Sequence, residues 1–433
     1  MSLAAPKHYS DTIFALATAR GRSGVSVMRL SGPQVLQIVQ DLSGKRPLQP
    51  RRASLRTLTY NDTVIDEAIV IYFPAPHSFT GEDVIEIQGH GSLAVIQSLS
   101  ATLLAHGLRQ AEAGEFTRRA VENGRMDLTE AEGLLDLIDA ESEAQRRQAL
   151  RQMGGALRDQ YTYWRETLLD ALASVEGEID FADEGDVPDA LSHAAYAPLT
   201  DIVEEMGKAL DRVDRGQAVR NGIDIAIIGA PNAGKSTLLN SIIGRDIAIT
   251  SPQAGTTRDI VSANMVIAGL PVTVLDTAGL RETDDQIEAE GVRRARQAAD
   301  RSHLTIHLQR AGEDPVTPDP DHIHLWNVSH DPGIGDVNAL TGEGIDKLMS
   351  KLEMRIKMTF LNGEPASLTR ARHRDCVDRA MFHVKHARHN LGIAPEFVSE
   401  DIRCALSALD ELAGRSDIEE VFDRIFSQFC VGK

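Results

Sequence analysis

Residues 229–236 have the types and spacing of a phosphate-binding loop. They read Gly-Ala-Pro-Asn-Ala-Gly-Lys-Ser and follow the apolar stretch 223–228. The glycines let successive backbone N–H groups surround phosphate oxygens, Lys235 neutralises the charge of the phosphates, and the hydroxyl of Ser236 can bind Mg²⁺. Apolar residues then recur at helical spacing over 238–243, so the phosphates would lie at a helix N-terminus. This order of strand, loop and helix predicts a nucleoside triphosphate site and disfavours a chance match within a loop.

Two downstream segments extend this prediction. Residues 255–259 read Gly-Thr-Thr-Arg-Asp, and residues 276–279 read Asp-Thr-Ala-Gly at the end of a strand-like run. Thr257 would complete the Mg²⁺ shell with Ser236, Asp276 would hold the metal through water, and Gly279 would contact the γ-phosphate. This order favours a GTPase, although the local motifs alone leave an ATPase open. The predicted GTP-binding residues are Asn232, Ala233, Gly234, Lys235, Ser236, Thr237, Ser251, Pro252, Gln253, Ala254, Gly255, Thr256, Thr257, Asp276, Thr277, Ala278 and Gly279.

The guanine-binding signature is degenerate. An Asn-Lys-x-Asp motif would supply a carboxylate for the base, but residues 327–330 read Asn-Val-Ser-His, with Asp331 one position late and the lysine missing. Residues 338–344 have the form of the second guanine-contacting loop. We therefore expect base contacts from Asn327, Asn338 and Ala339, with GTP still bound but with weaker affinity or base discrimination.

The catalytic device also departs from the Ras type. Leu280 stands where Ras-type GTPases place a water-orienting glutamine. Glu282 is the nearest carboxylate able to orient a water molecule, and a monovalent cation could supply the positive charge of an arginine finger. From the residues alone, Glu282 is equally well explained as a solvated loop charge.

Composition limits the class of protein. The 433 residues are too many for one ordinary core and suggest about three domains. A net charge of −19 argues against nucleic-acid binding through the bulk surface. The cysteines are Cys376, Cys404 and Cys430, too few and too far apart for a disulfide framework or a zinc cluster. No apolar run has the length of a membrane span, and the first residues lack a signal-peptide core. We expect a cytoplasmic protein without membrane contact.

The apolar patterns predict a multidomain fold. Strands at 25–30, 68–73 and 84–87, with helices at 33–42 and 93–105, predict an α+β domain over 1–124. A capping box of Thr129 and Glu132 would begin a long helix reaching Leu157, followed by helices at 161–179 and 199–213 and an acidic break at 183–189. We expect an all-α helical domain over 125–219 and 356–433, interrupted by an inserted α/β phosphate-loop GTPase domain over 220–355 whose ends lie close together.

Motifs along the whole chain resemble one family. They lie at residues 11–13, 21–24, 29–33, 73–83, 114–117, 123–129 and 426–433, the last reading Phe-Ser-Gln-Phe-Cys-Val-Gly-Lys. Through them the chain resembles the tRNA modification GTPase MnmE (TrmE) family. The resemblance implies a homodimer joined through its N-terminal domains, which bind 5-formyl-tetrahydrofolate or a related folate. It also implies that the protein, with the flavoprotein MnmG, adds a (carboxymethyl)aminomethyl group to carbon 5 of the wobble uridine of tRNA, using GTP hydrolysis.

The same resemblance implies residue roles. Arg29, Glu86, Arg125 and Lys433 would line the folate site, with Arg125 where the family commonly has lysine. Potassium would be held by Asn232, Ser251, Gln253 and Thr256, and Glu282 becomes the preferred water-orienting residue. Cys430 matches the family's terminal cysteine, although its apolar neighbours favour an inert thiol.

Two alternative functions remain open. An Era-like regulatory GTPase would carry a KH domain after its GTPase domain, and a folate enzyme with a vestigial nucleotide domain is a weaker option.

Residues 370–389 hold a run of histidines and basic residues on a predicted helix. The missing Cys or acidic partner disfavours metal, and the run is best explained as a solvated basic face, in which Arg374, Lys385 and Arg388 are candidates for contact with tRNA phosphates.

Overall fold

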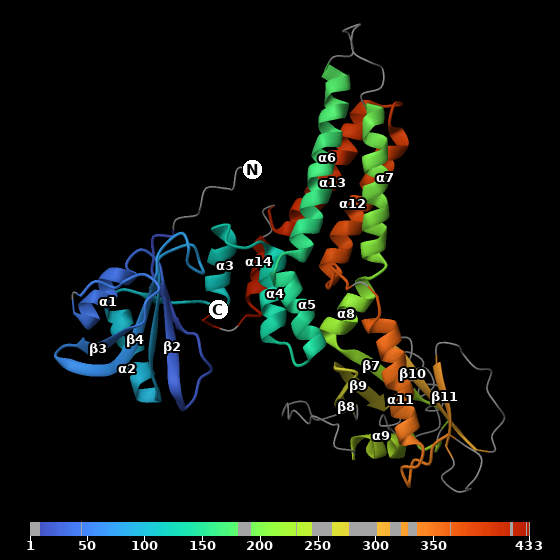
Figure 1. The fold of residues 1–433 in the computed structure, drawn as a ribbon, viewed down its shortest axis with the longest axis horizontal. Helices are drawn as coiled ribbons and strands as arrows, with labels where there is room; N and C mark the ends of the chain where they lie inside the picture. Colours follow the sequence, from blue (N-terminus) through green and yellow to red (C-terminus); the bar gives the residue numbers. More distant parts are fainter. Residues whose placement is uncertain are drawn as a thin grey trace, which may run out of the picture. The chain divides into compact units, whose positions relative to one another are not determined.

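The computed structural model describes residues 9–44, 46–180, 192–230, 232–244, 262–276, 301–311, 322–327, 336–363, 365–415, 419–429 and 431–432. The chain divides into two compact units, Met1–Leu135 with Leu409–Lys433, and Asp136–Ala408. Each is described by itself (Figure 1). None of the helices in the described ranges is both long enough and apolar enough to cross a membrane.

The first unit contains a six-stranded sheet with strand order β3-β4-β5-β2-β1-β6. All neighbouring strands are antiparallel except β1 and β6, which are parallel. The strands are β1 (Ile13–Leu16), β2 (Ser23–Ser31), β3 (Ser54–Tyr60), β4 (Thr63–Phe73), β5 (Val84–Gly91) and β6 (Arg109–Gln110). One face packs against α1 (Val35–Ser43) and α2 (Leu93–Ala105) through a continuous apolar core. The strands and helices predicted for this region are confirmed.

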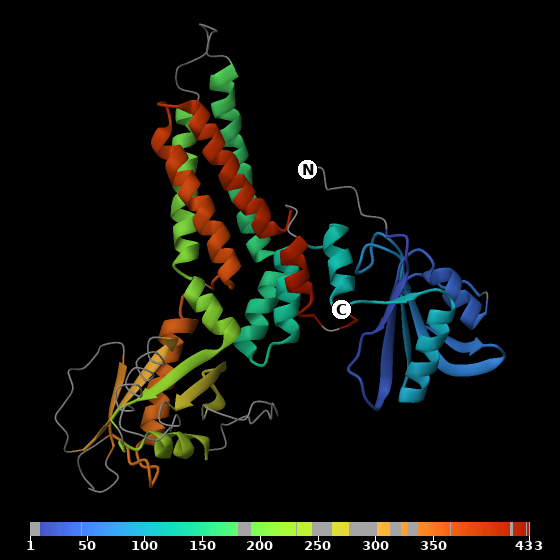
Figure 2. The same ribbon diagram turned by 180° about the vertical axis from the view of Figure 1, so that it is seen from behind.

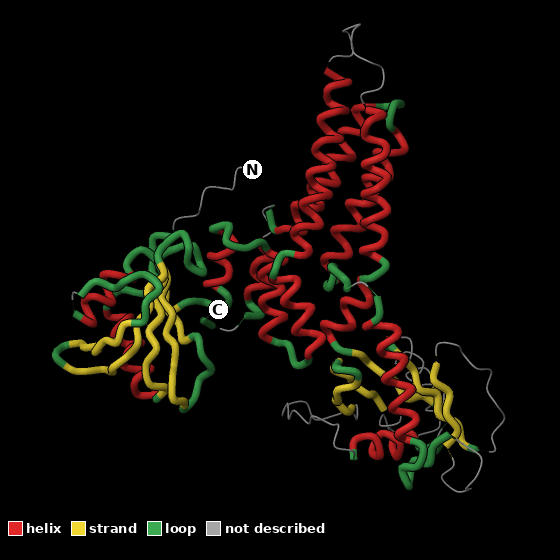
Figure 3. The backbone as a smooth tube through the Cα atoms, viewed as in Figure 1, coloured by secondary structure: helices red, strands yellow, loops and turns green. Residues whose placement is uncertain are grey.

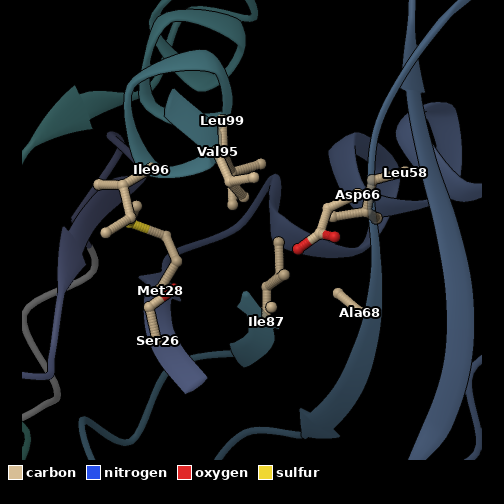
Figure 4. A pocket seen from close by; sticks show the side chains of 10 residues that line it. Ser26, Met28, Leu58, Asp66, Ala68, Ile87, Val95, Ile96 and Leu99 are labelled. Carbon is tan, nitrogen blue, oxygen red and sulfur yellow. The ribbon is translucent and has the colours of Figure 1, made fainter. Parts of the chain in front are cut away.

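A small cavity lies between this sheet and α2. Met28, Ile87 and Leu99 line it, and Figure 4 shows the Asp66 carboxylate beside them. Its volume of about 10 Å³ holds no more than a water molecule. The Asp66 carboxylate already accepts hydrogen bonds from the backbone N–H groups of Glu67 and His90. The cavity is therefore a packing feature and not a ligand site.

Three further helices complete the first unit: α3 (Glu115–Glu122), α4 (Leu128–Ile138) and α14 (Glu419–Phe426). Buried Leu128 and Ala131 of α4 pack against Ile425 and Phe426 of α14. The predicted cap of α4 is wrong by two residues. Asp127, not Thr129, caps the helix: its carboxylate accepts the N–H of Glu130, whose own carboxylate accepts the N–H of Asp127.

The predicted long helix from 129 to 157 is three helices. These are α4, α5 (Glu143–Met153) and α6 (Ala156–Asp180). Ser142 and Gln145 form a reciprocal capping box that begins α5. Gly155 has a φ of +86°, a conformation that an L side chain rarely adopts, and it separates α5 from α6. Apolar residues recur at helical spacing on both sides of these breaks, so the spacing alone does not reveal them.

The helices of the second unit form a bundle. Figures 1 and 3 show α6 beside α7 (Tyr196–Leu210), α12 (Ala371–Asn390) and the start of α13 (Pro395–Ala413). The indole N–H of buried Trp164 on α6 donates to the Glu205 carboxylate on α7, with an N···O distance of 3.1 Å. These helices confirm the predicted segments at 161–179 and 199–213. The predicted break at 183–189 lies outside the described residues.

The second unit also contains a five-stranded sheet with strand order β11-β10-β7-β9-β8. Its strands are parallel except for the antiparallel pair β8–β9. They are β7 (Ile223–Ile228), β8 (Ser262–Ile267), β9 (Leu270–Asp276), β10 (Leu304–Arg310) and β11 (His322–Asn327). Helix α11 (Ile345–Ile356) lies in front of the strands in Figure 1 and behind them in Figure 2. Helix α9 (Lys235–Ile243) follows β7, as the sequence predicts.

Both ends of this α/β segment meet at one carboxylate. Helix α8 (Val213–Asn221) leads into β7, and its Arg220 Nε lies 2.8 Å from Asp136 Oδ1. Arg370, which precedes α12, places its Nη2 2.7 Å from the same oxygen. The chain therefore leaves and re-enters the helical bundle at neighbouring points.

Candidate functional site

The loop between β7 and α9 has a conformation that requires glycine at two positions. Gly229 has a φ of +152°, and a Cβ there would lie 2.1 Å from the carbonyl oxygen of Leu308. Gly234 has a φ of +94°, and a Cβ there would lie 2.3 Å from Asn327 Nδ2. Asn232 also has a positive φ, 64°, which asparagine tolerates better than most residues. The glycines of the motif are thus explained by backbone geometry and by close approach of two other strands.

Lys235 lies inside this loop. Its side chain is buried, and its Nζ donates to the carbonyl oxygens of Gly229 and Ala230, each at 2.9 Å. Ser236 and Thr237 follow in the first turn of α9, where Ser236 is exposed. The ammonium group and the exposed hydroxyl lie at the start of one helix, where an anion is favoured by the helix dipole.

Asn327 joins the loop to the second predicted base-contacting segment. It ends β11 and is buried; its Nδ2 donates to the Ala233 carbonyl oxygen at 2.8 Å, and its Oδ1 accepts the N–H of Ala339 at 3.1 Å. Asn338 shapes the adjoining turn, because its Oδ1 accepts the N–H groups of Leu340 and Thr341. The structure thus brings Asn327, Asn338 and Ala339 together beside the phosphate loop.

Much of the remaining nucleotide site lies outside the described residues. This applies to Ser251, Pro252, Gln253, Ala254, Gly255, Thr256, Thr257, Thr277, Ala278, Gly279 and Glu282. Asp276 is the last residue of β9, and its backbone pairs in register with Ile227 at the end of β7. The predicted metal-holding aspartate is therefore on the strand next to the one that enters the phosphate loop.

The first unit contains a second group of predicted site residues. Arg29 on β2 and Glu86 on β5 are partners in the antiparallel register, with 2.9 Å between Nη2 and Oε1. Alternate strand residues face opposite sides, so this pair lies on the face away from α1 and α2. The Arg29 Cζ lies 5.3 Å from the ring centroid of Phe79 and 5.8 Å from that of Phe116. A partly exposed cation is thus held between an acid and two aromatic rings.

Arg125 contacts the same segment. Its Nε donates to the Ser78 carbonyl oxygen at 3.2 Å, one residue before Phe79. The structure therefore groups Arg29, Glu86 and Arg125 around residues 78–81. The fourth predicted residue, Lys433, lies outside the described residues.

Sequence reasoning missed a buried ionic network behind this group. Arg119 on α3 is 0% exposed, and its guanidinium contacts carboxylates of Asp11, Glu82 and Glu115. Burial alone would raise the pKa of Glu115, but hydrogen bonds from Arg109, the Glu112 N–H and Arg119 outweigh it and lower that pKa. Asp11 likewise has a lowered pKa, since Arg109 and Arg119 outweigh its burial. Asp11, Glu82 and Glu115 lie in the motifs that resemble the family, and this feature of the sequence could have identified the network.

The histidine-rich helix α12 differs in part from its prediction. The Nδ1 atoms of His383 and His386 lie 2.9 Å from the two carboxylate oxygens of Asp401 on α13. Arg374 pairs with Asp214. The sequence showed no acidic partner because Asp401 lies on the next helix, and these pairs neutralise part of the predicted basic face. Among the described residues, Cys376 and Cys404 are not joined in a disulfide, and Cys430 lies outside the described residues.

The strand, glycine-dependent loop and helix at residues 223–243 define a protein that binds nucleoside triphosphates through a phosphate loop. Two family models match the chain: "GTP-binding protein TrmE N-terminus" over residues 12–125 and "MnmE helical domain" over residues 128–430. The chain is 48% identical to the tRNA modification GTPase MnmE of Maricaulis maris, over 98% of this chain and 100% of that protein. It is 44% identical to the protein of the same name from Caulobacter vibrioides, again over 98% and 100%. The chain belongs to the MnmE (TrmE) family.

Proposed function

We propose that this protein is a GTPase that acts in tRNA modification. Its GTP hydrolysis, with Mg²⁺ and K⁺ bound, drives the addition of a (carboxymethyl)aminomethyl group to carbon 5 of the wobble uridine. The one-carbon unit comes from a formyl-tetrahydrofolate, and the flavoprotein MnmG is the partner. The observation that carries this proposal is the phosphate loop of residues 229–236, tied through buried Asn327 to the base-contacting segment at 338–341.

Two groups of described residues would contact the nucleotide, one at its phosphates and one at its base. Lys235 exchanges its carbonyl partners for phosphate oxygens, and the N–H groups at the start of α9 face the same charge. Asn327 holds the loop and the turn at Asn338 at a fixed spacing, which positions the base. Two buried hydrogen bonds through one side chain offset part of the loss of the usual lysine.

We infer the metal roles from the residue types and their order in the sequence. Hydroxyl and carboxylate oxygens are the ligands that Mg²⁺ prefers, and we assign Mg²⁺ to Ser236 at the start of α9, to Thr257 and, through water, to Asp276 at the end of β9. We assign K⁺ to Asn232, Ser251, Gln253 and Thr256, as the resemblance to the family implies; of these, Asn232 is an exposed residue of the phosphate loop. K⁺ supplies charge beside the phosphates, and Glu282 orients the attacking water.

The folate belongs to the first unit. The Arg29 guanidinium, held between Phe79 and Phe116, can stack on a flat ring or meet a carboxylate. Glu86 can accept from the amino donors of a pterin, and Arg125 and Lys433 offer further charge to the glutamate tail. We place this folate-binding and dimer-forming domain at about residues 1–124 and the GTPase domain at about 220–355, within the helical domain of 125–219 and 356–433.

tRNA binding uses local charge, because the chain as a whole carries −19. Lys385 and Arg388 on α12 are the cationic groups that we assign to phosphates, with further contacts from MnmG. The Era-like alternative has less support, because the described residues after 361 form helices α12, α13 and α14.

The decisive experiment measures wobble-uridine products by mass spectrometry of tRNA from a deletion strain. Wild-type protein restores the modified nucleoside, whereas Glu282→Ala binds GTP and fails to restore it. Purified protein hydrolyses GTP faster in K⁺ than in Na⁺. Equal GTP hydrolysis rates in K⁺ and Na⁺ would exclude the role of K⁺. If tRNA of the deletion strain contained no more unmodified wobble uridine than tRNA of the parent strain, the proposed pathway would be excluded.

A further inference from the structure

Three histidines gather on one face of the second sheet. His307 lies on β10 and His324 on β11, and they are direct partners in the parallel register. His322 lies two residues before His324 and therefore points to the same side of the strand. Ring centroids are 5.3 Å apart for His307 and His324, and 6.1 Å apart for His322 and His324. One ring nitrogen from each histidine lies within 4.8 Å of the others.

These separations are close to those of a metal site. Zn²⁺ binds imidazole nitrogens at about 2.0–2.1 Å in tetrahedral sites, which places two ligating nitrogens about 3.3–3.4 Å apart. Closing the cluster around an ion thus requires movements of about 1 Å, which small changes of side-chain torsion provide. The rings are half-buried, so an ion there remains accessible from solvent. Three nitrogen ligands leave a fourth position for water.

The surroundings suit a transition metal better than Mg²⁺. The three ligands are nitrogens, whereas Mg²⁺ prefers oxygen. The opposite face of the same strands is apolar, with Ile306, Leu308 and Leu325 in the core, which keeps the imidazoles on one side.

We infer that His307, His322 and His324 form a binding site for a divalent transition metal, with Zn²⁺ as the best-fitting ion. The ion would cross-link β10 to β11 on the face opposite Ile306, Leu308 and Leu325, which share a core with Ile345, Leu348 and Leu352 of α11. Strand β11 ends at Asn327, which holds the phosphate loop through Ala233. Metal binding therefore stabilises the strand that supports the nucleotide site, although the ion is separate from that site.

Calorimetric titration of the full chain with ZnCl₂, without nucleotide, tests this inference. His307→Asn, His322→Asn and His324→Asn should each weaken Zn²⁺ binding at that site by at least about tenfold, since even losing a residue behind a metal ligand costs 10- to 100-fold. Exposed His389→Asn is the matched control and should bind as the wild type does. The double variant His383→Asn with His386→Asn, which removes the pair on Asp401, should also retain the site.

Zn²⁺ binding that persists in all three variants, or that is lost in the double variant, would overturn the inference. Circular dichroism of each metal-free variant separates loss of the fold from loss of a ligand. If the variants do not fold, the visible spectrum of the Co²⁺-loaded wild type decides. Intense bands of a four-coordinate ion support the site, and the weak bands of a six-coordinate ion contradict it. Neither readout depends on GTP hydrolysis or tRNA modification, so failure here leaves the proposed function untouched.

Discussion

The cationic side chains of the two candidate ligand sites have different kinds of partner. In the first unit, Arg29 is paired with the carboxylate of Glu86 and lies against two aromatic rings. In the second unit, Lys235 donates to two neutral carbonyl oxygens of its own loop. An anionic ligand must compete with a charge at Arg29, but at Lys235 it replaces neutral dipoles and gains a charge-assisted bond. The first site therefore favours recognition of a ligand with both donors and acceptors, and the second favours affinity for phosphate.

The supports behind the two sites differ in the same sense. The first site rests on carboxylates gathered around buried Arg119, and its stability depends on charge. The second rests on two glycines and the uncharged side chain of Asn327. Substitutions should thus unfold the first site and weaken binding at the second.

Replacing Arg119 with leucine should have the largest effect. It leaves Asp11, Glu82 and Glu115 without their shared buried cation, and breaking a buried pair costs about 3–5 kcal/mol. Hydrogen exchange of peptides from β2 and β5 reports the loss. Both tryptophans, Trp164 and Trp326, lie in the second unit, so the unfolding followed by their fluorescence should not change.

Arg118→Leu is the matched control for this experiment. Arg118 is 29% exposed and pairs with Glu122 and with the 68% exposed Asp423, so its loss should cost less than that of Arg119, which is 0% exposed. Equal destabilisation by the two variants would show that the burial of Arg119 does not matter.

Replacing Lys235 with alanine should reduce GTP hydrolysis by about 100- to 1,000-fold, the usual cost of removing one preorganised donor to a charged transition state. Folate binding by the first unit should not change. The control is Lys347→Ala, an exposed lysine on α11, which should hydrolyse GTP at the wild-type rate. A loss of folate binding in Lys235→Ala would refute the separation of the two sites.

Replacing Asn327 with alanine should have a smaller effect on the same site. It leaves the Ala233 carbonyl and the Ala339 N–H without their buried partner, at a cost of about 1–3 kcal/mol. Fluorescent GTP-analogue binding should weaken about tenfold, which corresponds to 1.4 kcal/mol. The control is Asn240→Ala, at an exposed position on α9, which should bind the GTP analogue as the wild type does. If Asn327→Ala bound the analogue as tightly as Asn240→Ala, Asn327 would have no role in nucleotide binding.

The sequence predicted the strand, the loop and the helix of residues 223–243 well, because their geometry is local. The strand at Ile223–Ile228, the glycine positions and the following helix depend on neighbours in the chain, and they are confirmed. The cap of α4 was wrong because residues 127–130 and 129–132 both have the pattern of a capping box, and periodicity does not choose between them. The pair Gly154–Gly155 indicates a helix break in the sequence, but the continuous apolar stripe led to the prediction of a single helix.

The contacts that the sequence could not predict are formed by distant segments. Arg119 meets Asp11, Glu82 and Glu115 only after β1, the loop before β5 and α3 come together. His307 and His324 become neighbours only through the register of β10 and β11, although the His-x-His spacing of residues 322–324 was visible. Charge clusters of this kind depend on topology, which the chemistry of single motifs does not specify.

The charge dependence of the first unit also predicts a pH effect, the smallest of these differences. Asp11 and Glu115 have pKa values below their ordinary 3.8 and 4.5, so their ionised forms stabilise the fold above those ordinary values. That contribution is lost as the pH falls through the lowered pKa values, because the unfolded chain then binds more protons. The urea midpoint of the first unit should therefore fall as the pH drops below about 4.5 and continue to fall below 3.8, whereas the glycine-based phosphate loop contributes no such dependence.

Asp11→Asn sharpens this measurement. Removing one titrating carboxylate should reduce the pH slope of stability by up to about 1.4 kcal/mol per pH unit. A short deuterium pulse at one fixed pH, given after equilibration in urea, reads the unfolded fraction of the first unit without changing the labelling chemistry. Asp62→Asn, at an exposed turn between β3 and β4, should retain the wild-type slope. Identical slopes in the wild type and Asp11→Asn would show that the network around Arg119 does not titrate with folding, and the contrast between a charge-supported and a glycine-supported site would then fail.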